Sequence, residues 1–419
     1  MKVAFSTLGC KTNQYETALM CEDLRGENEI IPFDQDADIY IINTCTVTQK
    51  ADYRSRQTIR KAIRKGPDAK VIVTGCYAER VPEELKAIGA CTVIGNRVKN
   101  QIKRYLDNIT KENELPAYGT VGTDNGTFRC RATFHTGRTR AFLKIQEGCN
   151  YKCSYCIVPI VRGKSQSASI KNVCEEVKAL IDGGYKEVVL TGIQLGAYGE
   201  DLKPNTNLYE LLKELLKIDG NFRLRLSSIE PQDITQEIIE IIKSSPKICR
   251  HLHIPLQSGD DRILNAMGRG YTTAYYKELV MSLINNIPDI GLGTDVIVGF
   301  PGESEKHYHN TYNLLNDLPL SYFHIFSYSD RPNTPIYRFK DKVPFKKTKG
   351  RNRQLQLLSE KKGIAFKNSM IGKQVEVLVE NKSISSRYIK GLTGNYLRLN
   401  LKNINYMEGE IIRLKVEGM

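Results

Sequence analysis

At 419 residues the chain is too long for one ordinary domain, and its 41% hydrophobic and 26% charged residues are typical of a water-soluble globular protein. No run of about 18 apolar residues occurs, and the N-terminus meets Gly9 and Lys11 before a secretory core could form, so we expect a cytoplasmic protein without a membrane span. The formal net charge of +14 favours a polyanionic partner such as nucleic acid, although basic chains without one also exist.

The first segment, residues 1 to about 118, alternates helical stretches with the β-rich runs KVAFS, DIYIINT, KVIVTG and CTVIG. This βαβ pattern predicts a mainly parallel sheet. Cys10, Cys45 and Cys76 each follow one of the first three runs, and the carboxyl ends of parallel strands share one edge. The three cysteines are therefore a candidate iron-sulfur site, with ordinary buried cysteines as the alternative.

Residues 119–138 are rich in Gly, Thr and Asn and predict a linker. From 139 to 367 strands and helices alternate again, with the strand runs AFLKIQ, EVVLTGI, RLRLSSI, HLHIPLQ, GLGTDVIVGF and SYFHIFSYS. Six such repeats predict a full or partial (β/α) barrel of the TIM type. Its chemistry belongs at the carboxyl ends of the strands.

A C-x3-C-x2-C loop, formed by Cys149, Cys153 and Cys156, follows the first strand of this segment. Three thiolates can hold three irons of a 4Fe-4S cluster and leave the fourth iron open for S-adenosylmethionine. Structural zinc is the alternative, but zinc usually takes four ligands in paired C-x2-C spacings and no fourth partner is nearby. The spacing, with Tyr155 before the third cysteine, resembles the signature of the radical S-adenosylmethionine superfamily.

Polar or small residues follow the later strands of the same segment, where a barrel enzyme binds its ligands. As candidate contacts to S-adenosylmethionine they are Gln194, Ser228, Glu230, Gln257, Asp295 and Gly299. Any single one could instead cap a helix. His251 and His253 alternate on one strand, and a packed or hydrogen-bonded histidine is the favoured interpretation for both.

The C-terminal part begins with a basic stretch, since residues 338–373 hold twelve basic and two acidic residues in a largely helical pattern. This stretch could contact a polyanion or form a solvated helix. Residues 368–419 then alternate apolar and polar positions between Gly and Asn. They predict a small antiparallel β-barrel, of a size often used to hold RNA.

The motifs LGCKTNQYE, INTCTV and TGCYAE are followed by the radical triad, Cys149, Cys153 and Cys156. Together they resemble the methylthiotransferase family over nearly the whole chain. The resemblance implies a second 4Fe-4S cluster on Cys10, Cys45 and Cys76, a radical barrel and a C-terminal TRAM domain. It also implies replacement of C–H by C–SCH3, two uses of S-adenosylmethionine, and a reductant protein of the flavodoxin or ferredoxin type.

Within the family, LGCKTNQYET and INTCTVTQKADYRSRQTIRKA resemble the branch that modifies threonylcarbamoyladenosine in tRNA. The implied product is 2-methylthio-N6-threonylcarbamoyladenosine at position 37, on the 3′ side of the anticodon. Arg56, Arg60 and Arg64 recur on one helix face and are candidate contacts to tRNA phosphates, although solvated helices carry similar stripes. The threonyl carboxylate needs a cation, for which Arg162 is the candidate.

Two alternatives stay open at this point. The same chemistry could act on isopentenyladenosine in tRNA or on an aspartate of a ribosomal protein. A protein of another class, a non-catalytic iron-sulfur RNA-binding sensor, would not need the open iron that the radical triad provides.

Overall fold

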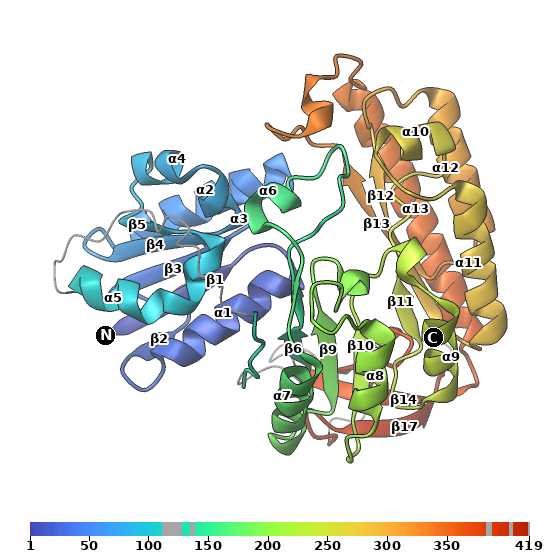
Figure 1. Cartoon of the computed structure of the whole chain (residues 1–419), viewed down its shortest axis with the longest axis horizontal. Coiled ribbons are helices and arrows are strands. Elements are labelled where there is room, and N and C mark those ends of the chain that lie inside the picture. Colours follow the sequence, from blue (N-terminus) through green and yellow to red (C-terminus); the bar gives the residue numbers. More distant parts are fainter. Residues whose placement is uncertain (111–127, 135–138, 383–387, 402–404, 418–419) are drawn as a thin grey trace.

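The computed structural model describes residues 1–110, 128–134, 139–382, 388–401 and 405–417. The predicted linker at 119–138 lies mostly outside these ranges. Within them, no helix combines the length and the apolar character needed to cross a membrane. Figure 1 shows an N-terminal α/β part, a larger central part, and a C-terminal sheet beneath the central strands.

A five-stranded sheet forms the N-terminal part, in the order β2-β1-β3-β4-β5. All of its strand pairs are parallel, which confirms the predicted parallel sheet. Its strands are β1 Lys2–Thr7, β2 Glu29–Ile31, β3 Ile39–Thr44, β4 Lys70–Gly75 and β5 Thr92–Ile94. Strand β2 was not predicted from the sequence.

Helices cover both faces of this sheet, since β3 is buried on both sides. Ile39 and Ile41 face α1 (Lys11–Leu24) and α5 (Ile102–Thr110) in one apolar cluster. Tyr40 and Ile42 face the other cluster. Its helices are α2 Gln49–Lys65, α3 Cys76–Arg80 and α4 Pro82–Ala87. All six residues of β3 are buried and the first four are apolar, as expected for a strand of a sheet that is covered on both faces.

Six parallel strands in chain order form the central part. They are β6 Ala141–Lys144, β9 Glu187–Thr191, β10 Arg223–Leu226, β11 His251–His253, β12 Gly291–Val298 and β13 Tyr322–Ser327. They pair as two three-stranded sheets, and the bridges Leu224–Ile248 and Ser228–His253 join β10 to the β11 segment. A short pair, β7 Gln146–Glu147 with β8 Gln166–Ser167, flanks the loop after β6.

Apart from the short α6, which packs against the N-terminal part, the helices that alternate with these strands lie on their outer side (Figure 1). Their bounds are α6 Val158–Arg162, α7 Ile170–Asp182, α8 Leu208–Leu216, α9 Gln236–Ser244, α10 Asp261–Ala266, α11 Thr273–Asn286, α12 Glu305–Asp317 and α13 Phe345–Ser369. The basic stretch noted in the sequence is mostly α13, whose Leu355 and Leu358 belong to the central core. One face of this helix is therefore packed, not solvated.

The C-terminal sheet is antiparallel, in the order β16-β15-β14-β17. Its strands are β14 Gln374–Lys382, β15 Ile389–Thr393, β16 Arg398–Leu401 and β17 Ile411–Lys415. Val377, Ile389 and Leu401 are among the buried residues of its own small core. The described strands show this sheet, and no pairing among them closes it into a barrel.

A buried ion cluster attaches this sheet to the amino ends of the central strands. Glu187 on β9 accepts hydrogen bonds from Arg223 at 2.7 Å and from Arg225 at 2.7 and 3.0 Å. Both arginines also donate to carbonyls of the C-terminal sheet, Arg223 to Leu392 at 2.8 Å and Arg225 to Thr393 at 3.0 Å. Glu187 thus fixes the two arginines that hold the sheet.

We expect Glu187→Gln to lower the free energy of unfolding by roughly 3 kcal/mol at neutral pH, because it leaves two buried guanidinium groups without their anion. Burial alone would raise the pKa of Glu187, but Arg225 and Arg223 lower it from 4.5 to about 2. A carboxylate with a lowered pKa stabilises the fold above its unfolded-state pKa, and this contribution fades as pH falls from 4.5 towards 2.

Urea unfolding of the wild-type and variant chains across pH measures this difference. The gap between them should be widest near neutrality and should narrow below pH 4.5. Glu210→Gln is the matched control, because Glu210 forms a surface ion pair with Lys213. A Glu187→Gln chain as stable as the control would contradict the prediction.

Candidate active site

The radical triad, Cys149, Cys153 and Cys156, lies in the loop between β6 and α6, at the carboxyl end of the first central strand. The Cys149 Sγ lies 3.2 Å from Gln194 Oε1, and the Tyr151 backbone N–H donates to that sulfur at 3.4 Å. Arg269 Nη1 donates to Cys153 Sγ at 3.2 Å. Backbone and side-chain donors are therefore already aimed at two of the three sulfurs.

The donor set fits a 4Fe-4S cluster better than a single ion. All eleven cysteines are free thiols. Burial raises the pKa of Cys149 to about 11 and that of Cys156 to about 12, so these thiols would become thiolates on binding iron. A single metal ion needs ligand atoms close to one another, and among the described residues His253, Asp295 and His324 have ligand atoms all within 4.8 Å of one another. The sulfur atoms of each cysteine triad are spaced more widely than this. Thiolates spread over the corners of a cluster satisfy this wider spacing.

The auxiliary triad, Cys10, Cys45 and Cys76, lies at the carboxyl edge of the N-terminal sheet. The three residues follow β1, β3 and β4, which are neighbours in the sheet. A Cβ on Gly9 would lie 3.0 Å from Cys45 Sγ, so only glycine allows this approach. Burial raises the pKa of Cys45 to about 12, and the nearby Cys76 and Cys10 add to the effect. The structure thus brings together three cysteines that are far apart in sequence.

The two triads are linked by α6, which begins two residues after Cys156. Ile157 and Val161 pack against Cys76 in one buried cluster. At the end of the helix, Arg162 Nε donates to Cys76 Sγ at 3.3 Å. The loop that carries the radical triad is therefore in direct contact with a member of the auxiliary triad.

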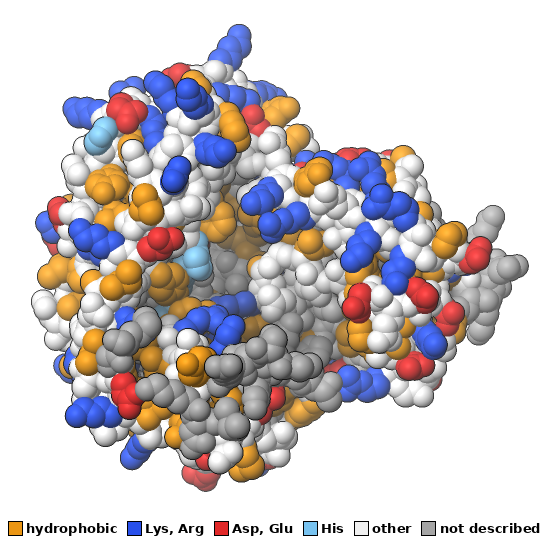
Figure 2. Space-filling model, turned by 180° about the vertical axis from the view of Figure 1, so that it is seen from behind, with side chains coloured by type: hydrophobic (Ala, Val, Ile, Leu, Met, Phe, Trp, Pro, Cys, Tyr) orange, Lys and Arg blue, Asp and Glu red, His pale blue; other side chains and the backbone are white. Residues whose placement is uncertain are grey.

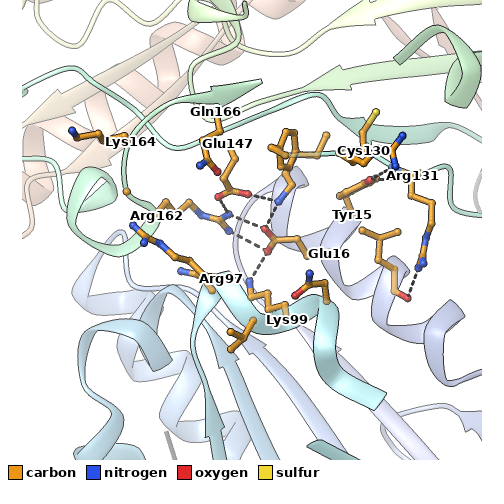
Figure 3. A pocket seen from close by; sticks show the side chains of 18 of the residues that line it. Tyr15, Glu16, Arg97, Lys99, Cys130, Arg131, Glu147, Arg162, Lys164 and Gln166 are labelled. Carbon is orange, nitrogen blue, oxygen red and sulfur yellow. Dashed lines mark hydrogen bonds and ion pairs between the residues drawn. The ribbon is translucent and has the colours of Figure 1, made fainter. Parts of the chain in front are cut away.

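Arg162, the candidate for binding the substrate carboxylate, occupies a different environment from the predicted one. Its side chain is 1% exposed and forms ion pairs with Glu16 at 2.8 Å and Glu147 at 2.6 Å (Figure 3). Its Nη2 also donates to Asn13 at 2.5 Å. Because protein carboxylates already neutralise the guanidinium, it does not present a free charge to a substrate.

Two of the candidate contacts to S-adenosylmethionine lie beside the radical triad. Gln194 is within hydrogen-bonding distance of Cys149. Glu230 pairs with Arg269, which also donates to Cys153. Arg269 was missed in the sequence because it lies in the loop after α10, away from any strand end, and only the fold brings it to the cluster loop.

Ser228, Gln257 and Gly299 follow the carboxyl ends of later strands, whereas Asp295 lies inside β12. Ser228 is exposed just past β10. Gln257 adopts a left-handed φ of 66°, and its N–H donates to the Asp295 carbonyl at 2.8 Å. Gly299 has a φ of 78°, and a Cβ there would lie 2.3 Å from Thr348 Oγ1. A side chain at position 299 would therefore push α13 away from the strands.

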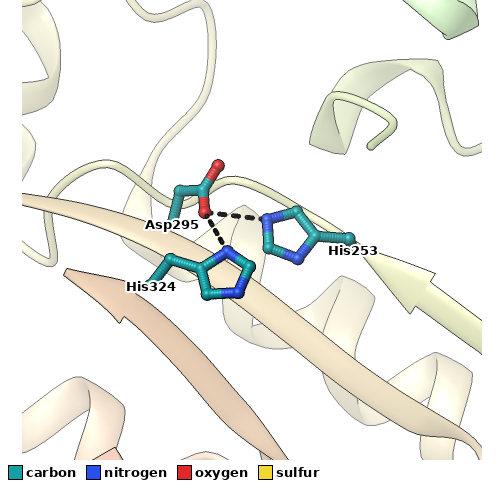
Figure 4. A group of neighbouring side chains, drawn as sticks. All are labelled: His253, Asp295 and His324. Carbon is teal, nitrogen blue, oxygen red and sulfur yellow. Dashed lines mark hydrogen bonds and ion pairs between the residues drawn. The ribbon is translucent and has the colours of Figure 1, made fainter. Parts of the chain in front are cut away.

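Asp295 accepts hydrogen bonds from two imidazoles, His253 at 2.9 Å and His324 at 3.1 Å (Figure 4). Burial acts to raise the pKa of Asp295, but these two hydrogen bonds keep it below the usual range. His253 is buried and His324 is exposed. His253 is thus a hydrogen-bonded histidine, as favoured from the sequence.

The three arginines predicted to contact RNA lie on α2 but in two environments. Arg56 donates to the Tyr77 hydroxyl at 2.5 Å and to Glu84 at 3.3 Å, so it is tied to the neighbouring helices. Arg60 and Arg64 are exposed, together with Lys61. Only the latter part of the predicted stripe is therefore free to meet a polyanion.

Comparisons with known proteins first define the class. Residues 143–315 match the family model of the Radical SAM superfamily, and residues 2–113 match that of Uncharacterized protein family UPF0004. A structure of the radical S-adenosylmethionine methyltransferase TsrM from Kitasatospora setae aligns with a TM-score of 0.60 at 16% identity, over 80% of this chain and 75% of that one. The chain is a radical S-adenosylmethionine enzyme, a class that uses a 4Fe-4S cluster with S-adenosylmethionine.

Full-length relatives then give the family. The chain is 40% identical to Threonylcarbamoyladenosine tRNA methylthiotransferase MtaB of Aquifex aeolicus, over 99% of this chain and 100% of that protein. It is 39% identical to the protein of the same name from Bacillus subtilis, over 99% of this chain and 93% of that protein. The chain is also 33% identical to the tRNA-2-methylthio-N(6)-dimethylallyladenosine synthase of Clostridium botulinum, over 98% of this chain and 93% of that protein. The chain belongs to the methylthiotransferase family, which confirms the resemblance seen in its cysteine motifs.

Proposed function

We propose that this protein is a tRNA methylthiotransferase that converts N6-threonylcarbamoyladenosine at position 37 to 2-methylthio-N6-threonylcarbamoyladenosine. The observation that carries the proposal is the contact of α6, the helix that directly follows the radical triad, with Cys76 of the auxiliary triad, through Arg162, Ile157 and Val161. The relatives named for the threonylcarbamoyl substrate, at 39 and 40% identity, favour it over the dimethylallyl substrate named for a relative at 33%.

The six cysteines would hold two 4Fe-4S clusters, the radical cluster on Cys149, Cys153 and Cys156 and the auxiliary cluster on the other three. When bound, the clusters and S-adenosylmethionine supply a carbon radical that removes hydrogen from C2 of the adenine and a methylated sulfur that replaces it. The protein's own part is to orient the sulfurs and exclude water. Arg269 and the Tyr151 backbone N–H orient Cys153 and Cys149 by the hydrogen bonds described above.

We assign the contacts to S-adenosylmethionine to the carboxyl ends of the central strands. They are Gln194, Ser228, Glu230, Gln257, Asp295 and Gly299. The bidentate cation that the threonyl carboxylate requires is not assigned to Arg162, because Glu16 and Glu147 neutralise its charge.

The proposed domain division is 1–118 for the auxiliary-cluster domain, 119–138 for a linker, 139–367 for the radical domain and 368–419 for a TRAM-like RNA-binding domain. We interpret the six central strands as a partial (β/α) barrel, because they follow one another in parallel. The separate core of the C-terminal sheet supports its treatment as a domain of its own.

The tRNA would lie over the hollow between the N-terminal and central domains, around which Lys and Arg side chains gather (Figure 2).

Arg60→Glu/Arg64→Glu should weaken tRNA binding on the order of tenfold at physiological salt. It should also lower the slope of log Kd against log salt by about two, since each lost phosphate contact removes about one. Fluorescence anisotropy across a salt series measures both quantities.

Lys178→Glu/Lys277→Glu is the matched control, because it reverses two exposed charges on α7 and α11, two helices of the central domain that lie away from α2 (Figure 1). Equal weakening by both double variants would mean that net charge, and not α2, determines binding.

A reductant protein of the flavodoxin or ferredoxin type would deliver electrons to the radical cluster, in the cytoplasm where tRNA is modified. A groove of about 1590 Å³ reaches the radical loop at Cys149 and Lys152. Arg97 and Lys164 also line it, so its charge suits an acidic electron carrier.

Nucleoside analysis of tRNA from a strain that lacks this gene tests the function. The strain should lose 2-methylthio-N6-threonylcarbamoyladenosine and accumulate its precursor, while methylthiolated isopentenyladenosine and the ribosomal aspartate stay unchanged. Loss of either of the other modifications instead would transfer the function to that substrate.

A further inference from the structure

A buried polar cluster joins the N-terminal domain to the loop of the radical triad. Glu16 on α1 accepts from Lys99 at 2.5 Å, from Lys144 at 2.9 Å and from Arg162 at 2.8 Å. Glu147 accepts from Lys144 and, at 2.6 Å, from Arg162. Figure 3 shows Glu16, Lys99, Glu147 and Arg162 converging between the two domains. Three cations thus face two carboxylates, which leaves a net positive charge at this point.

Arg162 is the member of this cluster that reaches the auxiliary triad. Its five N–H groups are directed at Cys76 Sγ through Nε and at Glu16, Glu147 and Asn13 through the two Nη atoms. The planar guanidinium cannot turn towards one partner without losing the others. The carboxylates therefore fix the direction of the N–H that meets the sulfur.

Asn13 links the Arg162 guanidinium to the backbone segments of the auxiliary triad. Its Nδ2 donates to the Leu8 carbonyl at 2.7 Å and to the Thr44 carbonyl at 3.0 Å, in the segments that precede Cys10 and Cys45. Its Oδ1 accepts from Arg162. The Arg162 guanidinium is thereby positioned against all three segments that carry the auxiliary triad.

A hydrogen bond to a cluster-bound thiolate, combined with a nearby positive charge, stabilises the more negative, reduced form of an iron-sulfur cluster. Because the Arg162 side chain is 1% exposed, water neither competes for this hydrogen bond nor screens the net positive charge of the buried polar cluster around it. The effect falls on the auxiliary cluster, since the contact is with Cys76 and not with the radical triad.

We propose that Arg162 is a positioning residue that raises the reduction potential of the auxiliary cluster through its hydrogen bond to Cys76. The proposal rests on the proposed function only in that Cys76 ligates that cluster. It replaces the substrate-binding role expected from the sequence with one that the contacts of Arg162 support.

The test compares two charge-matched double variants of the reconstituted holoenzyme. Arg162→Met/Glu16→Gln removes the donor to Cys76 together with one carboxylate. Lys99→Met/Glu16→Gln removes a different cation with the same carboxylate and leaves the Arg162 donor in place. Both variants keep the net charge of the cluster, so a difference between them reports the hydrogen bond.

The readout is a potentiometric titration followed by electron paramagnetic resonance. The midpoint reduction potential of the auxiliary cluster is identified as the one that disappears in the Cys10→Ser/Cys45→Ser/Cys76→Ser chain, which lacks the ligands of that cluster. We expect Arg162→Met/Glu16→Gln to lower that midpoint and leave the radical midpoint unchanged, whereas Lys99→Met/Glu16→Gln leaves the auxiliary midpoint near that of the wild type. Equal shifts in the two variants, or no shift in either, would overturn the proposal.

If Arg162→Met/Glu16→Gln gives no soluble protein, Arg162→Lys replaces it, because lysine keeps the charge but has no Nε–H beside Cys76. It should also lower the auxiliary midpoint, and an unchanged midpoint would reject the role of the hydrogen bond. A wild-type titration with only one cluster midpoint would instead refute the two-cluster function, independently of Arg162.

Discussion

Replacing Cys10, Cys45 and Cys76 together with serine should abolish methylthiolation of tRNA and leave formation of 5′-deoxyadenosine intact. The reason is that the three residues form a site separate from the radical triad, at the edge of another sheet. Iron content should fall from about eight to about four per chain, since one of two 4Fe-4S clusters is lost. Iron analysis, nucleoside mass spectrometry and quantitation of 5′-deoxyadenosine measure the three quantities.

The comparison variants separate this result from general damage. Cys153→Ser should eliminate both products, because an incomplete radical triad cannot hold the cluster that cleaves S-adenosylmethionine. Cys91→Ser should change neither, since Cys91 is exposed and belongs to neither triad. If the auxiliary-triad variant still methylthiolated tRNA, the auxiliary cluster would not be the source of the methylthio group.

We expect Asp52→Ala to lower the free energy of unfolding by about 3–5 kcal/mol, because it leaves two largely buried arginines without their carboxylate. Asp52 on α2 accepts from Arg80 at 2.8 Å and from Arg331 at 2.6 Å. Arg331, in the loop after β13, also donates to the Thr46 carbonyl at 3.3 Å, one residue past Cys45. The same change should therefore loosen the auxiliary triad as well as the contact between the domains.

Urea unfolding and iron content after reconstitution measure these two effects of Asp52→Ala. Asp36→Ala is the matched control, since Asp36 is 91% exposed and pairs only with Lys65 at the surface. Such a pair contributes about 0–1 kcal/mol. Similar unfolding of the two variants would show that Asp52 does not bind the domains together.

Much of the architecture could be predicted from local patterns. The β-rich runs after residues 1, 37, 69 and 90 became β1, β3, β4 and β5, because alternating strands and helices leave a clear period in the sequence. The convergence of Cys10, Cys45 and Cys76 followed from the same pattern, since each closes one βα unit of a parallel sheet.

The partners of individual charged side chains could not be predicted, because they depend on contacts between distant segments. Arg162 meets Glu16 across 146 residues, and Arg269 meets Cys153 across 116. Nothing in the local sequence around Arg162 shows that two carboxylates will neutralise it. For the same reason, the α2 stripe did not show that Arg56 would be tied to Glu84 and Arg60 would stay exposed.

Methylthiolation of threonylcarbamoyladenosine in tRNA is the function proposed for this chain. The most direct test incubates the anaerobically reconstituted protein with dithionite, S-adenosylmethionine and tRNA that carries this nucleoside, and then analyses the digested RNA by mass spectrometry. We expect 2-methylthio-N6-threonylcarbamoyladenosine together with 5′-deoxyadenosine. Formation of 5′-deoxyadenosine without the methylthio nucleoside would contradict the assigned substrate, and absence of both from protein that holds two clusters would contradict the enzymatic function itself.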